Sequence, residues 1–150
     1  MLQLKKHSIK VCIDILQDKI QSLGLIMQEV TTSANNETKS SAGDKHETSR
    51  AMMQLEQEKL SKQIAELAEQ KKEFDKIDFS KTYKNINQGS LVETNKGYFL
   101  IASSIGRIIV DDNPIFVISS KSPLAIAFNG IKQNEIILFN GVEYIVFNVC

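Results

Sequence analysis

The sequence has no tryptophan, only two cysteines, two prolines and two histidines, and no net charge at pH 7 over its 150 residues. The lone thiols of Cys12 and Cys150 form neither a disulfide framework nor a paired-cysteine metal knuckle, so a reducing compartment is expected. The even charge balance argues against a protein that mainly coats nucleic acid or an anionic membrane. No run of about 18 apolar residues and no signal-peptide pattern is present, which predicts a cytoplasmic protein without a membrane span.

Common catalytic patterns are absent as well. The sequence contains no glycine-rich phosphate loop, no HExxH and no CxxC, and its only histidines are His7 and His46. We therefore do not expect an independent enzyme.

Composition divides the chain near residue 88. Residues 1–88 hold 27 of the 36 charged side chains, whereas residues 89–150 hold five of the seven glycines and both prolines. Turn chemistry is thus concentrated in the second part. This shift predicts an α+β protein in which a helical region over residues 1–80 precedes a small domain over residues 89–150.

The first part is typical of an antiparallel helical hairpin. Apolar residues recur at alternating spacings of four and three, the pattern of a coiled-coil seam. The first seam comprises Ile9, Ile13, Leu16, Ile20, Leu23, Met27 and Val30, and the second Met53, Leu60, Ile64, Leu67 and Phe74. Residues 31–43 are polar and small, so a turn is predicted there, with the hairpin tip near residues 31–47. A fold about residue 40 would set Met27 against Met53 and Ile20 against Leu60.

The second part is typical of short strands joined by tight turns. Asn140-Gly141 lies between two apolar runs and predicts a two-residue hairpin, since this turn needs positive φ at both positions. Ser122 and Pro123 suit the start of a short helix that Gly130 closes. We predict a twisted, mainly antiparallel sheet packed on one short helix.

The polar sequence Gly43-Asp44-Lys45-His46-Glu47 at the start of the second helix supports two interpretations. In the first, Asp44 caps the helix and Glu47 reaches back to complete a capping box. In the second, the two carboxylates lie one turn apart on one face and share a hard divalent cation. His46 is a weaker candidate for a third ligand, because a zinc site needs three or four well-placed ligands.

The length of the second helix bears on the choice between these two interpretations. A helix over residues 44–76 rises roughly 48 Å at about 1.5 Å per residue, which holds its acidic start far from the opposite end. Such a rod suits insertion into a deep opening of a larger assembly. The alternative is a coiled coil that serves only for dimerisation, although a monomer is expected because the hairpin satisfies its own seam.

These features together resemble the Gre family of bacterial transcript cleavage factors. Gly43-Asp44-Lys45-His46-Glu47 matches the family's tip motif G-D-x-x-E, and Glu56 falls where the family often has a glutamate. The stretch ISSKSPLAIAFNG, with a later Y-x-V strand, resembles the C-terminal family motif. The resemblance implies an N-terminal antiparallel coiled coil and a C-terminal FKBP-like domain.

The resemblance also implies a function. The domain over residues 89–150 would dock on RNA polymerase near Ser122, Pro123 and Leu124, and the hairpin would enter the secondary channel. Asp44 and Glu47 would help to hold a second Mg²⁺ there and so promote cleavage of backtracked RNA near its 3′ end. The chain would then be an accessory factor that supplies acidic ligands, with no stable metal when free. At the family level, DNA binding is implied as well.

Two alternatives remain open. Thr48-Ser49-Arg50-Ala51 follows the acidic pair where the family commonly has Asn-Ala-Glu-Tyr, and Arg50 beside the acids favours a regulator that occupies the channel without promoting cleavage. An FKBP-like fold also raises peptidyl-prolyl isomerase activity, by analogy of fold alone.

Overall fold

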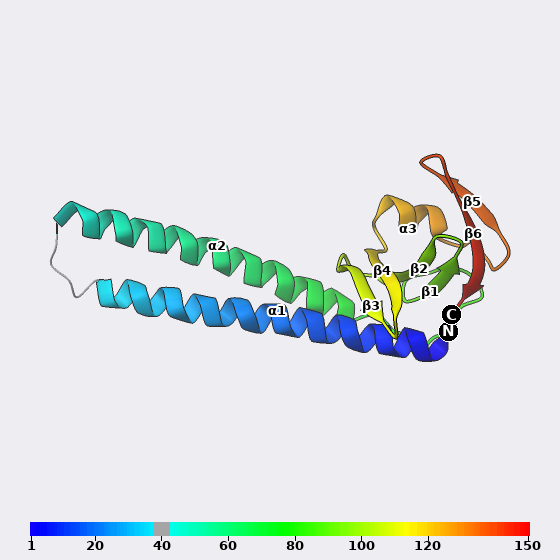
Figure 1. The fold of residues 1–150 in the computed structure, drawn as a ribbon, viewed down its shortest axis with the longest axis horizontal. Helices are drawn as coiled ribbons and strands as arrows, with labels where there is room; N and C mark the ends of the chain where they lie inside the picture. The colour runs from blue at the N-terminus through cyan, green and yellow to red at the C-terminus, as the bar shows by residue number, and fades with distance from the viewer. Residues whose placement is uncertain (38–42) are drawn as a thin grey trace. The chain divides into compact units, whose positions relative to one another are not determined.

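The computed structural model describes residues 1–37 and 43–150, apart from the side chains of Glu37, Asp44 and His46. Two long helices, α1 (Leu2–Glu37) and α2 (Gly43–Asp75), precede six strands and a short helix (Figure 1). The predicted α+β architecture is therefore confirmed. Within the described residues, no helix combines the length and the apolar character that a membrane crossing requires.

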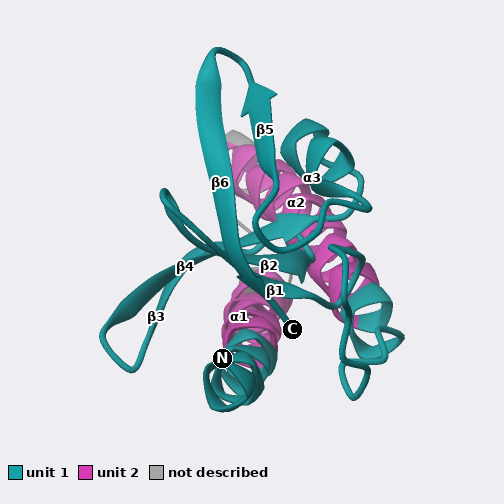
Figure 2. Ribbon diagram, turned by 90° about the vertical axis from the view of Figure 1, so that its right-hand side faces the viewer, with its two compact units in different colours: residues 1–14, 72–150 teal, residues 15–71 magenta. Residues whose placement is uncertain are grey.

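The chain forms two compact units, which Figure 2 shows in different colours. One comprises residues 15–71, the greater part of the two long helices. The other joins residues 1–14 to residues 72–150 and contains the whole sheet. Both long helices thus contribute residues to both units.

Helix α1 is longer than the sequence predicts. It continues through Thr31 to Glu37, where a turn was expected, while residues 38–42 of that turn lie outside the described residues. The extension contains no glycine or proline, and Ser, Thr and Asn lower helix propensity by only about 0.5 kcal/mol each. A polar stretch of this kind continues a helix that has already formed.

The register of the hairpin also differs from the prediction. The Gln57 side-chain amide donates to the Thr31 hydroxyl at 3.2 Å, and Leu23 lines a groove together with Gln63 and Leu67. These pairings lie about one heptad from the predicted fold about residue 40. A shift of one heptad returns seam positions to seam positions, so the apolar pattern does not distinguish the two registers. As a result, the first turn of α2 extends past the last described turn of α1 (Figure 1).

The sheet has six strands in the order β3-β4-β2-β1-β6-β5. Their bounds are β1 (Leu91–Thr94), β2 (Gly97–Ala102), β3 (Gly106–Val110), β4 (Asn113–Ser119), β5 (Ile136–Phe139) and β6 (Val142–Val149). All neighbours pair antiparallel except β2 and β4, which are parallel. The two-residue turn between β5 and β6 is confirmed, with φ of 49° at Asn140 and 75° at Gly141.

One face of the sheet packs on α3 (Pro123–Phe128). The core there contains Ile86, Val92, Phe99, Ile101, Ala125, Phe128 and Val146, all buried. Phe128 is fully buried, and its ring meets those of Phe99 and Tyr144 edge-on, at centroid distances of 5.4 Å in both cases. This aromatic cluster fixes α3 on the sheet.

The first turns of α1 bury a polar face in the sheet-containing unit. Lys5 is 1% exposed, and its ammonium group donates to the Lys81 carbonyl at 3.0 Å and lies 5.6 Å from the centroid of the Tyr83 ring. Burial lowers the Lys5 pKa, because it disfavours the charged form. The Ser8 hydroxyl donates to the Leu4 carbonyl at 2.6 Å. Both buried polar side chains therefore have partners.

Cys12 shares this buried face, and its thiol is expected to be inert in the folded protein. Burial raises the Cys12 pKa to about 12, so the reactive thiolate at pH 8 is about a thousandfold scarcer than for a free cysteine. We expect iodoacetamide to leave Cys12 unmodified in native Cys150→Ser protein and to alkylate it in guanidinium. Mass spectrometry of the alkylated peptide measures this, and labelling at the free-thiol rate in native protein would contradict it.

Candidate functional site

The first candidate site is the start of α2. The helix begins at Gly43, whose φ of 24° lies in a region that disfavours other residues. Asp44 lies in the first turn and Glu47 follows three positions later, so the helix places them on the same face. The Glu47 side chain is exposed. The backbone of α2 therefore holds both acids near the N-terminal end of a long helix, and their role as metal ligands stays a prediction.

The helix start does not decide the capping interpretation. The helix α2 begins at Gly43, but the φ of 24° at this residue is not a helical value. The side chains of Asp44 and His46 lie outside the described residues, so the capping box and the third-ligand role of His46 stay predictions. Among the side chains that the structure does describe, no group of three His, Cys, Asp or Glu residues comes together.

Basic side chains accompany the acids. Lys45 and Arg50 are both exposed, and Arg50 lies three positions after Glu47, where helix geometry makes the two side chains neighbours. The tip therefore carries charges of both signs. A cation bound there would need oxygen ligands from elsewhere, because two carboxylates leave most of the six positions around Mg²⁺ unfilled.

The second candidate site is helix α3. Ser122 is its N-cap: the hydroxyl accepts from the Ala125 amide at 3.3 Å, and Pro123 occupies the first turn. Leu124 is partly buried and packs against the core of the sheet. Ser122 and Leu124 therefore have structural roles in addition to the docking role implied by the resemblance, whereas Pro123 is exposed.

Ile126 is an exposed residue of α3 that the sequence analysis did not single out. Its side chain is 62% exposed, while Ala125 and Phe128 on either side of it are buried. The helical period supplied the signal, since residues 125 and 128 on one face place residue 126 on another. Pro123 and Ile126 together give α3 an accessible apolar surface, which we call the α3 face.

Comparison with known proteins adds a structural likeness. No model of a known protein family and no curated protein sequence matches the chain. Among solved structures, the chain is similar to GreA factor homolog 1 (Gfh1) of Thermus thermophilus, with 16% identity and a TM-score of 0.36. The likeness covers 92% of this chain and 94% of the other.

Proposed function

We propose that the chain is an accessory factor of bacterial RNA polymerase that inserts its hairpin into the secondary channel and stimulates cleavage of backtracked nascent RNA. The observation that carries the proposal is the position of Asp44 and Glu47. Both lie within the first five residues of a 33-residue helix, and the start of that helix extends past the last described turn of α1. The motif resemblance at residues 43–47 and at residues 118–130 supplies the identity of the partner.

Each part of the chain has a task in this proposal. The paired helices carry the acidic turn to the polymerase active site, over a length of roughly 50 Å for α2. The α3 face, formed by Pro123 and Ile126, contacts the rim of the channel and holds the hairpin in place. Acting as an accessory factor, the chain contributes ligands to the active site of the polymerase.

Asp44 and Glu47 are suitable ligands for a shared Mg²⁺. Carboxylate oxygens are the donors that Mg²⁺ prefers, and the exposed Glu47 is accessible to an ion held by another protein. When bound, a second Mg²⁺ activates water and stabilises charge on the attacking and leaving oxygens. The two acids would supply part of its coordination, and the polymerase would supply the rest.

A second candidate function rests on Arg50. Its guanidinium lies one helical turn from Glu47, so it can pair with that carboxylate and compete with a cation for it. In that case the hairpin would occupy the channel and block or remodel it without promoting cleavage.

Two measurements on the cognate polymerase test the proposal. We expect the wild-type chain to bind the enzyme and to accelerate RNA cleavage in backtracked complexes with Mg²⁺. We also expect Ile126→Asp to weaken binding by about tenfold, because it places a charge in an apolar contact. Leu138→Asp, which alters a residue 74% exposed on β5, serves as the matched control.

The outcomes separate the candidate functions. Binding without accelerated cleavage would favour the regulator that acts by occupying the channel. Absence of binding would contradict both polymerase functions. Equal losses from Ile126→Asp and Leu138→Asp would show that the α3 face is not the docking surface.

A further inference from the structure

A groove of about 510 Å³ lies on one side of the hairpin, toward the end where α1 finishes and α2 begins. All its residues belong to the unit of residues 15–71. It is lined by Glu29, Val30 and Ser33 of α1 and by Ser49, Met52, Met53 and Glu56 of α2. We call it the acidic groove.

The floor of the acidic groove is apolar and adaptable. Val30 and Met53 belong to the two seams and are partly buried, while Met52 is 66% exposed. An exposed methionine side chain has three rotatable bonds and a polarizable sulfur, so it adjusts to apolar side chains of different shape. The floor therefore suits an apolar anchor from another protein.

The charge of the groove indicates which sign of charge its partner carries. Glu29 and Glu56 are exposed carboxylates on opposite helices, and no basic residue is among those that line the groove. The two hydroxyls of Ser33 and Ser49 add hydrogen-bonding groups. Charge complementarity across an interface favours a cationic partner and disfavours phosphate or an acidic peptide.

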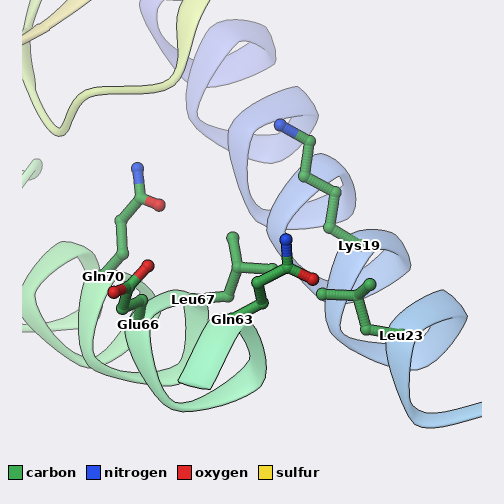
Figure 3. Close-up of a pocket in the computed structure, with 6 residues that line it drawn as sticks. All are labelled: Lys19, Leu23, Gln63, Glu66, Leu67 and Gln70. Carbon is green, nitrogen blue, oxygen red and sulfur yellow. The ribbon is translucent and has the colours of Figure 1, made fainter. Parts of the chain in front are cut away.

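A second groove on the same hairpin provides a contrast. It is lined by Lys19, Leu23, Gln63, Glu66, Leu67 and Gln70, which Figure 3 shows as sticks from both helices. Lysine and glutamate occur there together, so the lining has no net charge and indicates no partner of one sign. Of these two grooves, only the acidic groove has both an apolar floor and lining charges of a single sign.

We propose that the acidic groove receives a basic helical segment of RNA polymerase, with an apolar side chain on Met52 and Met53 and a Lys or Arg beside Glu29 and Glu56. A third helix laid along two paired helices buries its apolar face in the groove between them. The assignment of this segment to RNA polymerase rests on the proposed function. The kind of partner that fits the groove follows from the lining residues alone. This contact would hold the side of the hairpin and leave the first turn of α2 available.

The first experiment tests the chemistry of the groove with the full chain and a helical Leu/Lys peptide. We expect the peptide to shift the NMR signals of the Met52 and Met53 methyl groups and the same peptide with Glu in place of Lys to leave them unchanged. Glu29→Gln/Glu56→Gln should weaken binding of the Leu/Lys peptide by about tenfold. Asp14→Asn/Glu58→Gln, which removes the same charge from exposed positions outside the groove, should remain within twofold of wild type.

The second experiment measures binding of the same variants to RNA polymerase, with the same losses expected. If wild type binds polymerase and the groove variant binds equally well, the inference is overturned while the proposed function stands. If the peptide binds in the groove but wild type does not bind polymerase, the polymerase is excluded as partner and the proposed function fails. If the groove and control variants weaken binding equally, the effect comes from net charge alone, and the inference is overturned.

Discussion

The double variant Asp44→Asn/Glu47→Gln is expected to bind RNA polymerase within about twofold of wild type and to lose about a hundredfold of the stimulated RNA cleavage. Both substitutions keep the size of the side chain and remove its charge. The amides can accept hydrogen bonds, but they are poor ligands for Mg²⁺ compared with carboxylates. The expected loss therefore concerns the reaction and leaves docking unchanged.

The measurement follows shortening of 3′-labelled RNA in backtracked complexes over a range of Mg²⁺ concentrations. If the acids act as ligands, the double variant should need a higher Mg²⁺ concentration for the same rate, because it contributes less to holding the ion. A change of helix stability would not produce this shift. Asparagine is also a good capping residue, so the substitution at Asp44 preserves a cap if one exists there.

Two results would contradict the role of the acids. One is wild-type cleavage rates in the double variant, which would assign Asp44 and Glu47 to stabilisation of the helix end. The other is an equal loss in Asp14→Asn/Glu58→Gln, which removes two charges elsewhere on the same two helices. That outcome would show that net charge, rather than position, governs the effect.

The sheet and α3 could be predicted because their signals are local. Asn140-Gly141 demands a two-residue turn wherever it lies between strands, and Ser122-Pro123 demands a helix start. A second turn of this kind, at Asp111 and Asp112 with φ of 49° and 61°, was not singled out. Aspartate adopts positive φ less readily than glycine, so its sequence signal is weaker.

The register of the hairpin could not be predicted, for a physical reason. Seam residues recur every seven positions, so two alignments one heptad apart bury nearly the same apolar side chains. The choice depends on contacts such as the hydrogen bond between Gln57 and Thr31, which no periodicity reveals. The acidic groove depends on that register, since it forms only where Glu29 and Glu56 line the same cavity.

The buried face of the first turns of α1 was missed for a related reason. The seam pattern indicates Ile9 and Ile13, yet the buried residues there are Lys5, Ser8 and Cys12. Burial of Lys5 requires the Lys81 carbonyl and the Tyr83 ring, which are supplied by a segment some 76 residues away. A single helix sequence contains no sign of such a partner. The position of Asp44 and Glu47 near the start of α2 depends only on the local sequence, so it could be predicted.

Phe128→Ala is expected to lower the free energy of unfolding by about 3–5 kcal/mol, the usual cost of deleting a buried aromatic ring. Phe128 is fully buried, and its ring contacts those of Phe99 and Tyr144 edge-on. Alanine would leave a cavity between α3 and the sheet, and its better helix propensity returns only about 0.5 kcal/mol. Urea denaturation followed by circular dichroism measures the change.

The control lies two residues earlier on the same helix. Ile126→Ala alters a side chain that is 62% exposed, so its effect on unfolding should stay within about 0.5 kcal/mol. A small loss for Phe128→Ala would show that the aromatic cluster does not hold α3 on the sheet. A large loss for Ile126→Ala would mean that this residue belongs to the core. With the expected pair of results, a binding defect in an Ile126 variant reports on docking and not on folding.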